Sequence, residues 1–361
     1  LMNFLRLAKR DDLPKKTEWL IRAGAILLSL VFSGLILLLF KLNPIEVFKT
    51  IIIGSVGSEM RIHQTIIKSV PLIITSLGVL VAFKMKFWNI GGEGQILMGA
   101  FAASYVALFF PEMPRAMALI LMIIAAVIGG GIWAFIPAFF KAKMGINETI
   151  FTLMMNYVAI KFVTFLQYQA WMDPNAKGFP RIAPFPEWAL LPKLFGVHIG
   201  YIIAIILVVL VHLFIKYTKK GYEITVVGES IETARYAGMN INKIIVIAML
   251  ISGGLCGIAG MIQVSGVEKT LAVGISGGYG FTAIITAWLA RLNAISALFV
   301  CIVFAMLLQG GAYIQVNLNV PSTVANVVQG TILFFVLGSE FFLQYRLIPA
   351  KRILKEGKEA A

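Results

Sequence analysis

Long apolar runs, separated by short polar or basic stretches, recur along this chain and limit what it can fold into. Runs such as 19–40, 116–140 and 244–263 hold about 20 residues or more, the length that a helix needs to cross the hydrocarbon of a bilayer. The chain of 361 residues is 59% hydrophobic and 13% charged. A soluble domain of this size cannot bury so much apolar surface. The sequence therefore predicts an all-α polytopic membrane protein.

We expect about ten membrane segments. The segment at 281–290 is interpreted as a half-span buried among other helices, because so short a helix cannot cross about 30 Å of hydrocarbon. Residues 41–65 are interpreted as a mixed segment between spans. The expected organisation is an N-terminal segment at 1–18, a membrane domain at 19–345 and a tail at 346–361. The ten segments are 19–40, 66–83, 90–110, 116–140, 148–167, 199–215, 244–263, 281–290, 294–308 and 324–342.

The basic residues predict the orientation. Ten segments place both termini on one side, and if that side is the cytosol, most of the 31 Lys and Arg residues are cytosolic, as is typical of membrane proteins. The net charge of +14 is therefore attributed to topology, and no nucleic acid is expected as a partner. The polar stretch 216–243 is then cytosolic and the loop 168–198 external. The apolar run after Arg22 is too long for a cleavable signal peptide.

The polar stretch 216–243 contains a predicted helix at 229–237. Glu229 and Glu232 fall in its first turns, where carboxylates favour the positive helix end, and Gly238 ends it. So short a helix is unstable alone in water and must dock on something. It indicates a transporter subunit coupled to a cytosolic partner, although an ordinary solvated loop helix fits the same pattern. The residues expected to enter a close-fitting groove are the small ones, Ala234, Ala237 and Gly238.

Two glycine motifs resemble each other. IGGEGQ at 90–95 and SGGYGF at 276–281 both place G-G-x-G at the start of an apolar segment. The predicted topology puts the first motif at the inner membrane face and the second at the outer face. Two similar units of opposite orientation are typical of an inverted-repeat transporter with broken helices. Chance similarity or ordinary helix packing is the alternative.

The chain shows little that predicts covalent chemistry. No P-loop motif is present, so any nucleotide hydrolysis belongs to a partner, and neither a cofactor nor a metal is expected. GISGG at 274–278 fits the pattern of an intramembrane serine hydrolase with Ser276 as nucleophile. Such an enzyme needs a base beside the serine, and His63, His198 and His212 all precede it. Ser276 is more simply interpreted as a helix cap.

Polar side chains within the apolar segments are the candidates for contact with a transported solute. Carboxylates inside a membrane are usually functional, and Glu93 lies in a glycine-broken turn. Interhelical hydrogen bonding explains polar rows in membrane helices equally well. Basic residues are nearly absent from these segments, which argues against a phosphorylated solute. The candidate path residues are Trp88, Asn89, Glu93, Asn156, Asn326 and Gln329.

Four motifs together resemble a known family. They are FWNIGGEGQILMGA, NETIFTLMMNY, GESIETARYAGMN and GYGFTAIITAWLARLNAISALF. In this order they are similar to the permease subunits of bacterial ATP-binding-cassette (ABC) importers, in the branched-chain amino acid and simple-sugar permease superfamily. The similarity covers about 65–345 and is greatest to the nucleoside-uptake branch. The second glycine of GGEG and the missing proline after Asn293 depart from the common pattern and weaken the assignment to a branch.

The resemblance implies a fold, partners and a location. The fold is an inverted-repeat type II importer permease with ten segments in the bacterial cytoplasmic membrane and both termini cytosolic. The partners are a second permease subunit, an ATPase that binds the ATP, and an external substrate-binding lipoprotein. The coupling helix falls on 229–238, with Glu229, Glu232, Ala234, Arg235 and Gly238 as its residues. Nucleosides are the expected solutes, with a sugar or an amino acid as alternatives, and a free-standing secondary transporter is a further alternative.

Overall fold

The computed structural model describes residues 5–9, 14–176, 178–319 and 321–349. The chain divides into two compact units, Leu1–Ser55 with Gly310–Ala361, and Val56–Gln309. We call them the terminal unit and the central unit and describe each by itself. The predicted segments 1–18 and 346–361 lie only partly within the described residues.

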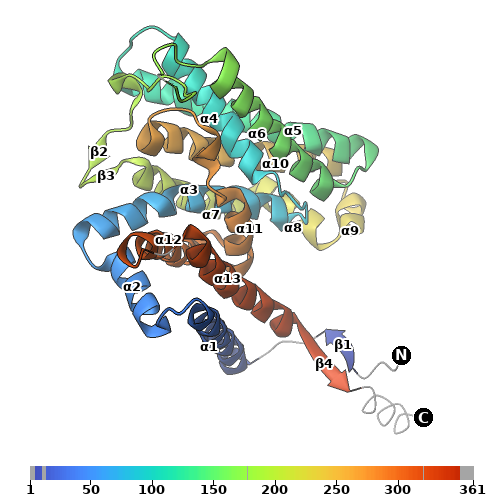
Figure 1. The fold of residues 1–361 in the computed structure, drawn as a ribbon. Helices are drawn as coiled ribbons and strands as arrows, with labels where there is room; N and C mark the ends of the chain where they lie inside the picture. Colours follow the sequence, from blue (N-terminus) through green and yellow to red (C-terminus); the bar gives the residue numbers. More distant parts are fainter. Residues whose placement is uncertain (1–4, 10–13, 177, 320, 350–361) are drawn as a thin grey trace. The chain divides into compact units, whose positions relative to one another are not determined.

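Five helices of the central unit run the full distance between its two ends (Figure 1). One end carries the hairpin of β2 (Lys193–Leu194) and β3 (Val197–His198), and we call it the hairpin end. The opposite end carries α8 (Lys219–Glu229) and α9 (Ile231–Tyr236), and we call it the α9 end. The five helices are α3 (Glu59–Lys84), α5 (Arg115–Met144), α6 (Glu148–Phe165), α7 (Gly200–Tyr217) and α10 (Ile241–Ile262).

Contacts at the hairpin end come from a long loop and three short helical turns. Gly196 of the hairpin lies against His63, near the start of α3. Arg115, the first residue of α5, donates a hydrogen bond from Nη2 to the Glu187 carbonyl over 3.2 Å. The turns are the π-helices η1 (Leu166–Ala170) and η3 (Gln263–Glu268), which extend α6 and α10, and the 3-10 helix η2 (Glu187–Ala189).

Contacts at the α9 end join the other ends of the same helices. Gly228 of α8 packs on the Lys84 carbonyl, where α3 ends. Lys141 near the end of α5 pairs with Glu148 at the start of α6, with 2.7 Å between Nζ and Oε2. No helix was predicted in the polar stretch before Glu229, but Thr218 begins α8 by accepting a hydrogen bond from the Gly221 N–H at 3.0 Å. A side-chain cap of this kind lets a helix start in a polar sequence.

Glycines let the central helices approach to backbone contact. Gly257 of α10 lies against the Ala126 carbonyl and the Cα of Gly130, both on α5. It also meets Gly99 of α4 (Gly92–Phe109). Without a Cβ on these residues, helices pack closely enough for dispersion to hold them in a medium that provides no hydrophobic effect between helices. The core of the central unit is therefore the α4–α5–α10 contact.

Two further helices complete the central unit. The short α11 (Tyr279–Leu289) follows the 3-10 turn η4 (Val273–Ser276) and packs on α3 and α4. Its length matches the half-span predicted at 281–290, and its outer face, with Phe281 46% exposed, is not covered within this unit. The helix α12 (Ala294–Asn317) begins in the central unit and ends in the terminal unit.

The terminal unit pairs the two ends of the chain. The helix α1 (Lys15–Leu39) packs on α13 (Ser322–Gln344), with ring centroids of Phe32 and Phe335 5.4 Å apart. The strands β1 (Leu5–Lys9) and β4 (Tyr345–Pro349) pair antiparallel. The helix α2 (Pro44–Val56) follows α1 at a bend of 114°. The prediction of a mixed segment at 41–65 is wrong here, because the Asn43 side chain caps the Ile45 N–H and Pro44 favours a helix start.

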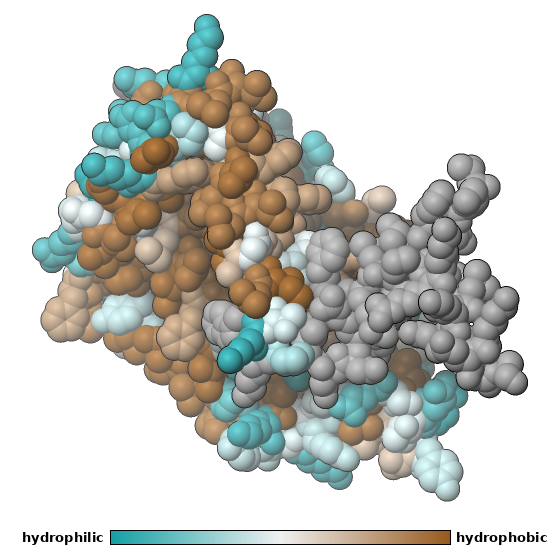
Figure 2. All heavy atoms as spheres, turned by 90° about the horizontal axis from the view of Figure 1, so that it is seen from below, coloured by the Kyte–Doolittle hydropathy of each residue, from teal (hydrophilic) through white to brown (hydrophobic). Residues whose placement is uncertain are grey.

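The number of full spans differs from the ten predicted segments. Among the described residues, six helices are long and apolar enough to cross a membrane, or seven if α1 and α2 form one span. The shortfall has physical causes: α11 is short, and α4 carries Glu93 and Gln95 in its first turn. Only 22% of the apolar window of α7 and 28% of that of α5 are buried within the chain. Figure 2 shows a broad apolar surface on the face seen from below, and the chain is an all-α polytopic membrane protein.

Candidate functional site: the junction of two broken helices

The two glycine motifs contact each other in the interior of the central unit. A Cβ added to Gly92 would lie 3.2 Å from the Cα of Gly280, and one added to Gly280 would overlap the Glu93 N–H. The motifs were predicted to lie at opposite membrane faces, and that placement is wrong. We call their contact the junction.

The first motif reaches the junction from the α9 end. After α3 ends at Lys84, the chain turns at Lys86 and continues without a helix to the start of α4, and Asn89 donates a hydrogen bond from Nδ2 to the Ser252 Oγ over 3.1 Å. Ser252 lies eleven residues into α10, which is about 16 Å along that helix. From the junction, α4 runs to the hairpin end, where the Phe109 ring lies 5.1 Å from that of Trp171.

The second motif reaches the junction from the hairpin end. The loop after η3 is held there by the Phe185 N–H, which bonds the Lys269 carbonyl at 2.8 Å. The chain then returns inward, and α11 runs on to the α9 end, where Trp288 contacts Phe83 with 5.9 Å between ring centroids. The two helices therefore leave the junction in opposite directions.

Glu93 joins the two motifs chemically. Its carboxylate accepts a hydrogen bond from the Gly280 N–H at 2.9 Å, and further ones from the Phe281 N–H and the Ser276 hydroxyl. Gly280 and Phe281 lie in the first turn of α11, and Glu93 lies in the first turn of α4. The carboxylate is 3% exposed and faces the positive ends of both helices. The two helix N-termini and the N–H donors favour the charged form of this carboxyl group, against the opposing effect of its burial.

Ser276 has a different role from the predicted one. It was interpreted as the cap of the following helix, but the residue before α11 is Gly278, at φ 78°, and no side chain caps it there. The left-handed conformation needs glycine at that position. Ser276 is buried and donates to Glu93, and His198 has no hydrogen-bond partner in the described structure. The arrangement does not resemble a serine–histidine pair.

Three buried amide side chains brace the break in the chain before α4. Asn156 of α6 accepts from the Gly94 N–H at 2.8 Å and donates to the Ile90 carbonyl at 2.9 Å. Asn89 and Gln95 exchange side-chain hydrogen bonds at 3.1 and 3.2 Å. Polar groups of an unwound segment need such partners inside a membrane. Asn89 and Asn156 therefore hold the backbone of the first motif, and their contact with a solute stays a prediction.

Trp88 is the predicted path residue with the most exposed surface in the central unit. It is 45% exposed, and its ring stacks on that of Trp288 with centroids 5.6 Å apart and planes at 29°. Phe83 packs on both indoles. Sequence reasoning missed Trp288 because nothing in its neighbourhood indicates that α11 ends beside the loop after α3.

The other two predicted path residues lie on α13 in the terminal unit. Asn326 is exposed, and the side chain of Gln329 lies outside the part that the structure describes. Their role as path residues stays a prediction.

The predicted coupling helix has a later start than the sequence indicated. Glu229 completes α8, and Ser230 is extended and caps α9 by accepting from the Thr233 N–H at 3.2 Å. Gly238, at φ 71°, follows the helix as predicted, and the Met239 N–H bonds the Ala234 carbonyl at 3.0 Å. Ser230 is the residue in the sequence that indicates where α9 begins, because serine is a preferred residue at the N-cap of a helix.

The surface of α9 also differs from the prediction. Ala234 is completely buried against the chain itself, so it is not available to a partner. The residues that project outward include Ile231, 52% exposed, and Tyr236, 98% exposed. Glu232, Arg235 and Gly238 are exposed as well. Beside α9 lies a cavity of about 370 Å³ whose walls include Phe87, Lys141, Ile231 and Ile245.

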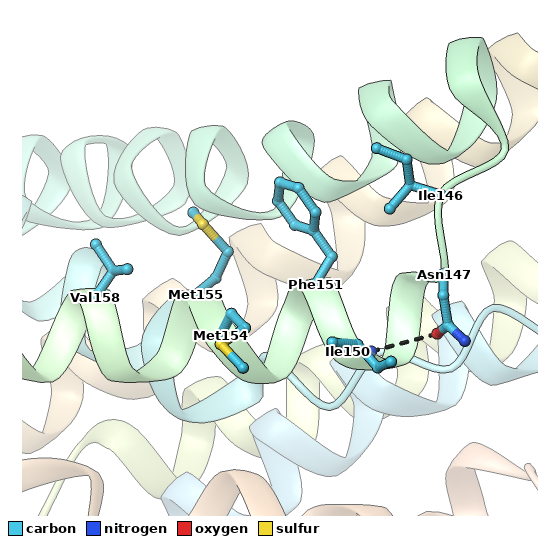
Figure 3. Close-up of a pocket in the computed structure, with 7 residues that line it drawn as sticks. All are labelled: Ile146, Asn147, Ile150, Phe151, Met154, Met155 and Val158. Carbon is cyan, nitrogen blue, oxygen red and sulfur yellow. Dashed lines mark hydrogen bonds between the residues drawn. The ribbon is translucent and has the colours of Figure 1, made fainter.

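A second cavity, of about 410 Å³, is a groove along α6 (Figure 3). It is lined by Ile146, Ile150, Phe151, Met154, Met155, Val158 and Asn147. Asn147 is the one polar residue, and its Oδ1 accepts from the Thr149 and Ile150 N–H groups at the start of α6. The groove therefore offers a polar solute little beyond the Asn147 amide N–H groups at its end, and most of its wall suits hydrocarbon.

Comparison with known proteins decides the family. The family described as "Branched-chain amino acid transport system / permease component" matches residues 61–337. The chain belongs to this family. The match includes the junction, α9 and most of α13, so every candidate residue described above lies inside the permease family's region.

Three curated relatives match over most of their length and are ABC transporter permease proteins. The glucose permease of Haloferax volcanii is 31% identical over 95% of this chain and 93% of its own. The nucleoside permease of Lactococcus lactis is 31% identical over 94% of this chain and 96% of its own. The guanosine permease of Bacillus subtilis is 32% identical over 87% of this chain and 92% of its own. Among solved structures, a chain of PsaBC from Streptococcus pneumoniae matches at 14% identity, covers 81% of this chain and 95% of its own, and has a TM-score of 0.46.

Proposed function

We propose that this chain is the transmembrane permease subunit of an ATP-driven importer in the cytoplasmic membrane, and that it forms the path for a small polar solute without catalysing a covalent reaction. The observation that carries the proposal is the junction. Two helices that begin in the interior of the central unit with facing N-termini, in a family of permease components, fit a central solute path.

The fold proposed is an inverted repeat with ten segments. One repeat of the inverted pair enters the junction from the α9 end and leaves it along α4. The other enters from the hairpin end and leaves along α11. Six helices are long and apolar enough to cross the membrane. The proposal adds four segments to them: α1 with α2 as one span, α4, α13, and α11 as a half-span. With the α9 end cytosolic, both termini are cytosolic and the hairpin end is external. The clustering of Lys84, Lys86, Lys141 and Lys143 at the α9 end supports this orientation.

The proposed partners follow from the surfaces of the two ends. An ATPase subunit docks on α9 through Ile231, Arg235 and Tyr236, since an almost fully exposed tyrosine beside a cavity is a typical anchor. A second permease subunit covers the outer face of α11, which the central unit leaves exposed. An external binding lipoprotein delivers the solute at the hairpin end.

The proposed solute is a nucleoside. Glu93 already occupies the positive ends of both broken helices, so the junction favours a solute without a carboxylate or phosphate of its own. This argues against an amino acid. The relatives named for nucleosides and guanosine support a nucleoside, and the glucose permease makes a sugar the second candidate. A flat nucleobase can stack on the indole rings of Trp88 and Trp288, whereas a sugar has no aromatic ring for such stacking.

Purification of the native complex tests the subunit assignment. The chain is isolated in mild detergent from its own cells, and co-purifying proteins are identified by mass spectrometry. We expect an ABC ATPase and an external binding protein, and ATP hydrolysis that the loaded binding protein stimulates. Solute uptake by the chain alone, driven by an ion gradient, would contradict the proposal and favour a secondary transporter.

A further inference from the structure

We infer that the charge of the Glu93 carboxylate holds the N-terminal end of α11 at the junction, and that loss of this charge releases the half-helix. Glu93 is thus a positioning residue for the transport path. The inference rests on the proposed function only in assigning α11 to the path. The attachment itself is a property of the folded chain.

The electrostatic arrangement at the junction needs a negative charge. The first turns of α4 and α11 face each other, and their unpaired N–H groups carry partial positive charge of the same sign. Without an anion between them these ends repel, and the Gly280 and Phe281 N–H groups face a neutral acceptor in place of a charged one. Hydrogen bonds to a charged acceptor are about twice as strong as those between neutral groups.

Left-handed residues lie on both sides of α11. Gly277 and Gly278, which precede α11, are left-handed at φ 49° and 78°. Arg291 and Leu292, which follow it, are both left-handed at φ 53° without being glycine. Such residues mark a change of chain direction that is held by its surroundings. The described side-chain bond further along α11 joins Thr286 to Ser76 of α3 at 3.1 Å, two turns from Glu93.

The contact on the other side of the junction is tight. Gly92 and Gly280 meet with no space for a Cβ, so α11 cannot move toward α4. Movement of its first turn is open only on the outer side, where the Phe281 side chain is 46% exposed. Release of α11 therefore increases the exposure of residue 281, which makes this position a reporter.

The test measures the reaction of a cysteine at position 281 with a water-soluble maleimide, in the purified full chain in detergent and without its partner subunits, so that the outer face of α11 stays uncovered. Cys256 and Cys301 are both buried, so the background reaction is low. F281C is compared alone and combined with E93Q or with S276A. Glu93→Gln keeps the size of the side chain and removes the charge. Ser276→Ala removes one neutral donor and keeps the charge, and is the matched control.

We expect E93Q to raise the labelling rate by about tenfold or more and S276A to change it by less than about threefold. Equal rates in F281C with and without E93Q would overturn the inference, and so would equal increases in E93Q and S276A. If the E93Q variant fails to accumulate, the Glu93→Asp variant is measured instead, because it keeps the charge. Accumulation of E93D, with a labelling rate near that of F281C alone, supports the inference. Failure of both variants contradicts a role of charge. The assay needs no solute, so its failure leaves the permease assignment intact.

Discussion

At the scale of single residues, backbone N–H and carbonyl groups supply most of the partners of the buried polar side chains around the junction. Glu93, Asn89 and Asn156 were selected because polar groups in apolar segments are unusual. The structure places all three around one break in the chain, with partners supplied by backbone N–H and carbonyl groups. No spacing rule reveals such partners, because they come from helices far apart in sequence.

His198 gives a prediction on pH. It is 1% exposed on the hairpin, lies against Gly200 and Gly266, and has no hydrogen-bond partner in the described structure. Burial, together with the positive charge of Lys193 on β2, lowers the pKa of His198 from 6.5 to about 4. The unfolded chain therefore binds a proton between pH 6.5 and 4 that the folded chain does not. Stability is complete above pH 6.5 and falls as the pH drops toward 4, by on the order of 2–3 kcal/mol.

The measurement is the melting temperature of the purified protein in detergent between pH 7.5 and 4. His198→Leu removes the titrating group and keeps an apolar contact, so its melting temperature should fall less steeply between pH 6.5 and 4. His63, which pairs with Glu59 beneath the same hairpin, provides the control, and H63L should keep the steep acid dependence. Parallel curves for H198L and the unmodified chain would exclude His198 as the cause.

At the scale of elements, hydropathy predicted the spanning helices well and the polar ones poorly. The expected spans at 66–83, 199–215 and 244–263 match α3, α7 and α10, with at most one residue of each span outside its helix. The sequence did not predict α8, because a helix at the membrane surface needs few apolar residues and depends on the Thr218 cap. It also missed that the two glycine motifs meet, since each motif specifies a turn and nothing about its neighbour.

The helix α9 provides a prediction on coupling. Tyr236 is 98% exposed, so Tyr236→Ala removes surface that only a partner can use. We expect Y236A to assemble in the membrane with unchanged melting temperature and to reduce ATP-driven uptake by about tenfold or more, because buried aromatic anchors contribute 2 kcal/mol or more to an interface, in rough terms. Uptake is measured in cells that express the complete complex. Normal uptake by Y236A would exclude this face as the docking site.

Ala234 serves as the contrasting position on the same helix. Because it is completely buried in the chain itself, Ala234→Trp overfills the contact of α9 with its own unit. We expect a lower melting temperature and reduced accumulation of the isolated subunit, before any partner is added. A fully stable A234W variant that fails only in transport would mean that Ala234 faces the partner after all.

At the scale of the whole molecule, orientation follows from the assignment of the α9 end to the cytosol. Lys219 is exposed at that end, and Asn175 lies in the loop at the hairpin end. A cysteine at position 219 should react with a membrane-impermeant thiol reagent only in inverted vesicles, and a cysteine at position 175 only in intact cells. The buried Cys256 and Cys301 give little background. Labelling in the reverse sense would place α9 outside and exclude it as an ATPase contact.

The central claim is that this permease subunit passes a neutral nucleoside along a path through the junction. The direct measurement is uptake of radiolabelled guanosine, glucose and leucine by vesicles containing the complete complex, with and without ATP. The account predicts ATP-dependent guanosine uptake that other purine nucleosides compete with and that leucine leaves unchanged. ATP-dependent leucine uptake without guanosine uptake would contradict the account, because a junction whose helix ends are already paired with Glu93 offers the leucine carboxylate no site.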